Sequence, residues 1–343
     1  MRCNILIVVK EMKYENMLRM TQHLSSRNYY THEDDNLEIT FEHLEFIEPA
    51  GALLFLATMD KIKELEVPYE IKPINHLKRS AISYGETMGI FQKLGISNAP
   101  SYSSGSTYIA PTKIIISDVY KEIELIGETV EDYFETISIR IVNKALSIVG
   151  FGITETVKDL FIFVVREMIR NIFDHSKSPH FYYALQSYRT IGCVEVVIAD
   201  VGVGLLRTVP FDIEERWLGK DTDEEAIRKA VIPGLSAYSN HTYAPEDYKN
   251  SGYGLALVKK IIQRTDGLFS LASGTKSITF TSEGENVVEC DVPGTIVRMR
   301  IQLDKLANAN FEEVLTEAEN EAKTRGYQHT PSTASRTVKS KKV

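Results

Sequence analysis

The stretch VVREMIRNIFDHS, residues 164–176, has the spacing of a helix with two different faces. At about 100° per residue, Glu167, Asn171 and Asp174 fall within about 60° of one another, with His175 at their edge. The apolar side chains form a separate stripe on the far side, made of Phe161, Val165, Met168 and Ile172. A helix that only packs in a core has no need of a carboxylate and an amide one turn apart. A role for this polar face therefore has to be inferred from the other segments of the chain.

The composition of the whole chain sets limits on its class. With 343 residues it is long enough for two or three domains, and 43% hydrophobic with 25% charged residues is typical of a globular protein. The net charge of −8 argues against broad nucleic-acid binding. Cys3, Cys193 and Cys290 are far apart and lack metal-ligand spacing, and the apolar run around Cys193 predicts a buried thiol in a reducing compartment. Because no stretch has the pattern of a signal peptide or the length of a membrane span, we predict a cytoplasmic protein.

Residues 1–96 alternate between strand and helix patterns. NILIVV and LEITF have the composition of strands, GALLFLATMDKIKEL has the pattern of a helix, and VPYEIKP returns to extended chain. This rhythm predicts a small α/β domain. The segment that follows, SNAPSYSSGSTYIAPT, is rich in Ser, Pro, Gly and Tyr, and we place a linker at residues 97–120.

Residues 121–305 have the pattern of a second α/β domain. Two long helices are predicted at residues 130–149 and 156–175, and shorter ones at DEEAIRKAVI, residues 223–232, and at GLALVKKIIQRT. CVEVVIAD, LFSLAS, SITFTS and TIVRMRIQL have the composition of separate strands. For residues 306–343, the composition predicts a polar helix followed by a disordered basic tail that faces solvent.

Three glycine-bearing segments follow the opening stretch: ADVGVGL after a strand, NSGYGLALVKK before a helix, and VPGTIV at the start of a strand. Asp200 can accept a hydrogen bond from an exocyclic amine such as that of adenine. Gly202 and Gly204 let the backbone pass close beneath a flat ring, where a Cβ would clash. Gly252 and Gly254 precede a helix, whose free N–H groups can face phosphate oxygens.

The polar face of the opening helix fits the same chemistry. The amide oxygen of Asn171 is a suitable ligand for Mg²⁺, which keeps water and phosphate oxygens in its shell. Glu167, one turn earlier, can polarise a water molecule for attack on a phosphate. Each of these residues alone is ordinary, since glycine pairs usually mark turns and helical Glu and Asn usually face water. Their order, context and spacing together favour nucleotide binding.

This ensemble resembles the GHKL (Bergerat-fold) ATPases, the superfamily of gyrase, MutL, histidine kinases and anti-sigma-factor kinases. EMIRNIFDH corresponds to the N-box, DVGVG to the G1 box, SGYGLAL to the G2 box and PGT to the final strand motif, so that the resemblance covers about residues 125–303. It implies a Bergerat-fold α/β sandwich with ATP and Mg²⁺ as cofactors.

The resemblance also implies a role for each matching residue. Glu167 would be the general base and Asn171 the Mg²⁺ ligand. The other nucleotide contacts that it implies are Asp200 and Thr295 at the adenine, Gly202 and Gly204 beneath it, and Gly252, Gly254 and Leu255 at the phosphates. Residues 205–250 would form a lid over the nucleotide, with Lys249 near its hinge. His175 would lie at the ribose or phosphate edge, or it would simply cap the helix.

The N-terminal part, LEITFEHLEFIEPAGALLFLATMDKI, is similar to STAS-type domains, in which the turn before the helix typically carries a serine. Here the turn is Glu48-Pro49-Ala50-Gly51, without a hydroxyl group. The resemblance therefore implies an interaction or regulatory module, and not a phosphate acceptor.

Three functions remain open at this point. The preferred one is slow ATP hydrolysis, with lid closure switching the interaction with a regulatory or effector protein. The alternatives are a serine/threonine kinase of the anti-sigma-factor type and a nucleotide sensor without hydrolysis. A histidine autokinase is disfavoured, because no histidine lies between Gly85 and Asp174. Homodimer formation is left open, since relatives often dimerise but no heptad run here demonstrates it.

Overall fold

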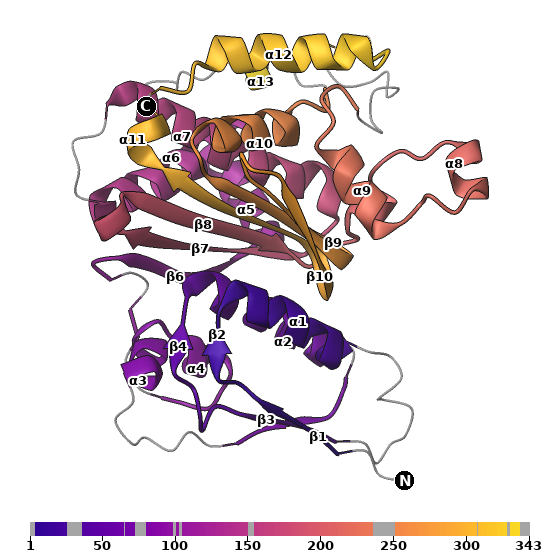
Figure 1. Cartoon of the computed structure of the whole chain (residues 1–343). Helices are drawn as coiled ribbons and strands as arrows, with labels where there is room; N and C mark the ends of the chain where they lie inside the picture. Colours follow the sequence, from indigo (N-terminus) through magenta and orange to yellow (C-terminus); the bar gives the residue numbers. More distant parts are fainter. Residues whose placement is uncertain are drawn as a thin grey trace.

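The computed structural model describes residues 4–25, 36–64, 66–72, 80–98, 101–102, 105–149, 154–235, 251–306, 308–327 and 330–336. These residues build a layered α/β protein (Figure 1). A small sheet, a pair of helices, a five-stranded sheet and a second set of helices follow one another across the molecule. The predicted mixed α/β class is therefore confirmed at this level.

The N-terminal unit contains a parallel sheet in the order β1-β3-β5 and a short parallel pair, β2 with β4. Its strands are β1 (Asn4–Val8), β2 (Glu11–Met12), β3 (Asn36–Thr40), β4 (Phe46–Ile47) and β5 (Tyr69–Ile71). Its helices are α1 (Tyr14–Ser25), α2 (Pro49–Glu64), α3 (Ser80–Thr87) and α4 (Ile90–Lys93). Parallel neighbours need a crossover connection, which the rhythm of strands and helices in the sequence predicted.

Helix α2 is buried on nearly every side, because it lies between the small sheet and the five-stranded sheet (Figure 1). Its apolar sequence, with Pro49 in the first turn, suits this place. Gly51 lies against the segment before α1, where a Cβ would overlap the carbonyl oxygen of Met12. Only glycine lets the two segments approach this closely.

The second unit is built on a five-stranded antiparallel sheet in the order β6-β7-β8-β10-β9. The strands are β6 (Tyr108–Ile115), β7 (His180–Tyr188), β8 (Cys193–Asp200), β9 (Leu268–Phe280) and β10 (Glu285–Gln302). Helices α5 (Ile116–Ile126), α6 (Val130–Val149), α7 (Glu155–Asn171) and α10 (Gly254–Arg264) lie on the side away from α1 and α2 (Figure 1).

Two boundaries differ from the sequence prediction. Residues 108–115, expected within the linker, form edge strand β6, and α5 follows at once. Tyr108, Ile109 and Ala110 are buried there, and this core contribution was hidden by the surrounding Ser, Pro and Gly. LFSLAS and SITFTS, expected as separate strands, form the single strand β9, because Gly274 continues the pairing with β10.

The remaining helices are α8 (Ile213–Trp217), α9 (Asp223–Ala230), α11 (Leu303–Leu306), α12 (Phe311–Thr324) and α13 (Thr333–Arg336). The expected helix at residues 223–232 and the polar helix after residue 306 correspond to α9 and α12. The basic end of the tail, residues 337–343, and the lid residues 236–250 lie outside the described residues. No helix in the part that the structure describes is long and apolar enough to cross a membrane.

Successive side chains of β8 and β10 point to opposite faces of the sheet, so each strand contributes to two hydrophobic cores. Val194, Val196 and Ile198 belong to the core shared with α7, whereas Val197 and Ala199 pack with the N-terminal unit. The five-stranded sheet is thus covered on both faces.

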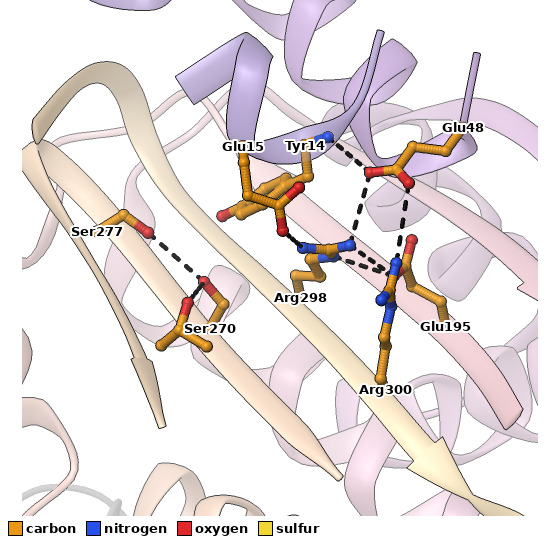
Figure 2. A network of polar contacts seen from close by, with 9 residues as sticks. Tyr14, Glu15, Glu48, Glu195, Ser270, Ser277, Arg298 and Arg300 are labelled. Atoms are coloured by element: carbon orange, nitrogen blue, oxygen red, sulfur yellow. Dashed lines mark hydrogen bonds and ion pairs between the residues drawn. The ribbon is translucent and has the colours of Figure 1, made fainter. Parts of the chain in front are cut away.

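A buried charge network joins the two units across this sheet (Figure 2). The guanidinium of Arg298 on β10 lies 2.6 Å from Glu15 of α1, 2.9 Å from Glu195 of β8 and 3.5 Å from Glu48 before α2. Glu48 also accepts the N–H of Tyr14 at 2.6 Å, and Arg300 pairs with Glu195. Because Arg298 is only 1% exposed, its charge is neutralised by these carboxylates and not by water.

Candidate functional site

A cavity lies on the helix side of the five-stranded sheet, between α7, α10 and the ends of β8 and β10. It is lined by eight residues that the sequence pointed to: Asn171, His175, Asp200, Gly204, Gly252, Gly254, Leu255 and Thr295. These residues come from four segments that are far apart in the chain. Glu167 and Gly202 are not among the lining residues.

Helix α7 carries the first of these groups. Thr154 caps its N-terminus by accepting the N–H of Val157, and the helix is buried from Leu160 to Ile169. The α-helical turns end at Asn171, earlier than the predicted residue 175, and Ile172–Ser176 continue as a π-helical turn. This wider turn is often found at functional sites. Here it brings His175 and Ser176 to the cavity.

The two faces of α7 are less separate than the sequence indicated. Met168 and Ile172, assigned to the core stripe, also line the cavity. Glu167, assigned to the polar face, is only 3% exposed. Helix α7 is covered almost completely, so burial alone does not mark its functional side.

Glu167 and Asn171 each present a buried polar atom without a hydrogen bond. Within the described part of the chain, Glu167 Oε1 and Asn171 Nδ2 have no hydrogen-bond partner. Buried polar atoms are nearly always bonded in native proteins, so such atoms indicate a bound molecule or a chemical role. The two residues lie one turn apart on α7, as the sequence predicted.

The start of α10 faces Glu167. A Cβ at Gly254 would lie 2.5 Å from Glu167 Oε2, so the absence of a side chain makes room for the carboxylate. Gly252 has a φ of +73°, and a Cβ there would overlap the backbone of Leu235. Gly254 and Leu255 in the first turn line the cavity. First-turn amides have no carbonyl partner within their helix, which makes them available to an anion.

Asp200 ends β8 at the other side of the cavity and is 3% exposed. Its Oδ1 accepts the N–H of Gly202 at 2.8 Å, and the backbone of Thr295 also bonds the carboxylate. Burial raises the pKa of Asp200 to about 6, although these backbone bonds lower it. At neutral pH the cavity therefore presents an oriented, ionised hydrogen-bond acceptor.

The glycines around Asp200 have different roles. Gly204, with φ +73°, lines the cavity. A Cβ at Gly202 would overlap the carbonyl oxygen of Ser176, so Gly202 allows the strand end to pack on the π-helical turn. Gly294, with φ +66°, approaches the backbone of Asp200 in the same way. This glycine belongs to the PGT motif, but the motif alone did not predict its close contact with Asp200.

His175 lines the cavity, and its pKa is lowered to about 4 by burial and by the charge of Arg170. Its imidazole is therefore neutral at physiological pH. Asp174 pairs with Arg170 at 3.2 Å and is not among the lining residues. Lys249, near the expected lid hinge, lies outside the described residues.

The rest of the lining is mostly apolar, and the sequence singled out none of these residues, although Leu205, Val209 and Lys229 lie within the segment 205–250 that was expected to form the lid. This part of the lining includes Ile198, Leu205, Val209, Leu271 and Val297. Lys229 of α9 lines the same cavity, donates to the carbonyl of Pro210 at 3.1 Å and pairs with Glu215 at 2.6 Å. These residues carry no motif, because their place in the cavity depends on how α9 and the strands pack.

Comparison with known proteins adds no identification. Neither the models of protein families nor the curated proteins include a match to this chain. Among the described residues, no group of three or more His, Cys, Asp or Glu side chains has the arrangement of a metal site.

Proposed function

We propose that the chain binds Mg-ATP in this cavity and hydrolyses it slowly, as a GHKL-type ATPase with a Bergerat fold. The observation that supports this proposal is the convergence of Asn171, Asp200, the Gly252–Leu255 turn and Thr295 on one cavity. Solvated surface residues from four distant segments have no physical reason to meet in this way.

The two ends of the cavity differ in chemistry as a nucleotide requires. Asp200 offers an acceptor for the amino group of adenine, next to an apolar slot for the flat ring. At the other end, the first turn of α10 offers amides and a positive helix dipole for phosphates. GTP carries a carbonyl oxygen where ATP carries the amine, so Asp200 would favour ATP.

The metal would be held from α7. Asn171 provides one oxygen ligand, and phosphate oxygens with water complete the shell that Mg²⁺ prefers. When bound, the ion would neutralise phosphate charge and polarise the terminal phosphate. Glu167, beside Gly254 and with Oε1 lacking a hydrogen bond among the described residues, would orient a water molecule and accept its proton.

Calorimetry tests nucleotide binding directly. Titration of the full chain with Mg-ATP should give heat, and Asp200→Asn should weaken the affinity about 10- to 100-fold, as expected for a hydrogen bond to a charged group. Asp118→Asn, a change of the same type on an exposed part of α5, should leave the affinity unchanged. Absence of heat from the wild-type protein with ATP would overturn the proposal.

Phosphate release separates hydrolysis from its alternatives. Glu167→Gln should bind Mg-ATP as tightly as the wild type but release no phosphate. If the wild type binds ATP and releases none, the nucleotide-sensor alternative holds. Transfer of the labelled terminal phosphate to a protein from cell extract would instead favour the serine/threonine kinase.

The N-terminal unit is the part that we propose as the STAS-like regulatory module. Thr295 and Val297 of β10 line the cavity, whereas Arg298 on the same strand holds α1 and α2 (Figure 2). A change at the nucleotide therefore acts on a strand that both units share. The turn before α2 carries Glu48 and no hydroxyl group, so it offers no phosphate acceptor.

A further inference from the structure

A row of three buried charges runs from α6 to the candidate base. Glu135 of α6 is 8% exposed, and Arg166 and Glu167 of α7 are 9% and 3% exposed. Arg166 Nη1 donates to Glu135 Oε2 at 2.8 Å. Its Nε lies 3.9 Å from Glu167 Oε1. The guanidinium therefore lies between two carboxylates, and it is hydrogen-bonded to the one farther from the cavity.

This arrangement is unusual for a structural ion pair. Two buried carboxylates flank one guanidinium. Within the described residues, Glu135 Oε1 and Glu167 Oε1 each lack a hydrogen-bond partner, although buried oxygens are normally satisfied. The guanidinium also lies 5.5 Å from the ring centre of Phe163 on the same helix.

We propose that Arg166 is a positioning residue for Glu167 and that Glu135 anchors it. The inference rests on the proposed function, in which Glu167 is the general base. At 3.9 Å the cation is beyond hydrogen-bond distance, yet near enough to steer a carboxylate by charge. The charge of Arg166 thus acts on Glu167 Oε1, while Glu167 Oε2 lies beside Gly254 of the cavity lining.

Single replacements would not test this role cleanly. Arg166→Met alone leaves two buried carboxylates without this cation, and Glu135→Gln alone removes a charged hydrogen-bond acceptor of Arg166, so both changes are destabilising. The double variant Glu135→Gln/Arg166→Met removes the hydrogen-bonded pair at similar side-chain volumes but still leaves Glu167 as a buried carboxylate. The triple variant that adds Glu167→Gln removes this charge too, and replacement of buried charges by neutral groups of similar volume is often neutral for stability. Together the two variants separate the effect on the fold from the effect on Glu167.

The experiment measures melting temperature, kcat and KM for Mg-ATP on the full chain. For the double variant we expect a KM close to that of the wild type but a kcat about tenfold lower, and for the triple variant we expect a melting temperature close to that of the wild type. The loss in kcat is part of the roughly 10²- to 10⁴-fold that a general base contributes. The matched control is Glu122→Gln/Arg140→Met, which removes an exposed pair at 3.7 Å that also involves α6, and should change none of the three values.

A double variant with the kcat of the wild type would overturn the inference, because a purely structural pair predicts that outcome. Hydrolysis that is absent in the wild type overturns it too, while nucleotide binding by calorimetry then shows whether the cavity assignment survives. If the double variant does not fold, Glu135→Asp serves instead. It keeps both charges but draws the guanidinium back toward α6, so kcat should fall severalfold at unchanged KM; an unchanged kcat refutes the role.

Discussion

Replacing Asp200 by asparagine should stabilise the protein while it weakens nucleotide binding. The carboxylate is 3% exposed, and burial raises its pKa from 3.8 to about 6. The folded state therefore holds the proton more tightly than the unfolded state does. Ionisation of Asp200 costs the folded state nothing below pH 3.8, and the cost grows until the pH passes about 6.

The size of this cost follows from the pKa difference. From 3.8 to about 6 is about 2.2 units, and each unit corresponds to about 1.36 kcal/mol. At pH 7.5 the asparagine variant should therefore be more stable by up to about 3 kcal/mol, and at pH 4 by almost nothing. An amide oxygen still accepts the N–H of Gly202, so the main backbone bond is kept.

Urea unfolding of both proteins between pH 4 and 7.5 measures the effect, because other titrating groups cancel in the difference between the two curves. Asp118→Asn is the control: this exposed carboxylate on α5 pairs with Lys121 at 2.9 Å, and its difference curve should stay flat. If the stability gain of Asp200→Asn does not grow with pH, the carboxylate is not buried as described. The ionised Asp200 lowers the stability of the folded protein at neutral pH, and such a loss of stability is expected where function requires the charge.

Three further experiments test the fold. Arg298→Met should lower the free energy of unfolding by about 3 kcal/mol in urea, because it leaves the buried carboxylates Glu195 and Glu48 with the partly exposed Arg300 alone; a loss below about 1 kcal/mol would contradict the network. Gly51→Ala should destabilise by at least about 3 kcal/mol in a thermal melt, because the methyl group overlaps the carbonyl of Met12, and an unchanged melt would place α2 elsewhere. Trp217, the single tryptophan of the chain, is 86% exposed on the projecting helix α8 (Figure 1), so acrylamide should quench its fluorescence fully; a shielded, blue-shifted emission would be inconsistent with this placement.

The sequence by itself determined the local elements and the order of the chemical motifs. Periodicity identified α6, α7, α9 and α10, since one apolar face per helix is written into neighbouring residues. The glycines at 252 and 254 were recognisable for the same reason, because a tight turn before a helix depends on the residues within it.

Only the tertiary structure decided which distant groups meet. Strand β6 was hidden in a Ser- and Pro-rich segment, because its stability comes from pairing with β7 and not from its composition. The three charges Glu135, Arg166 and Glu167, and the network around Arg298, involve residues that look like ordinary surface charges in the sequence. Burial and charge pairing depend on long-range packing, and no local pattern encodes the partner across a sheet or between two helices.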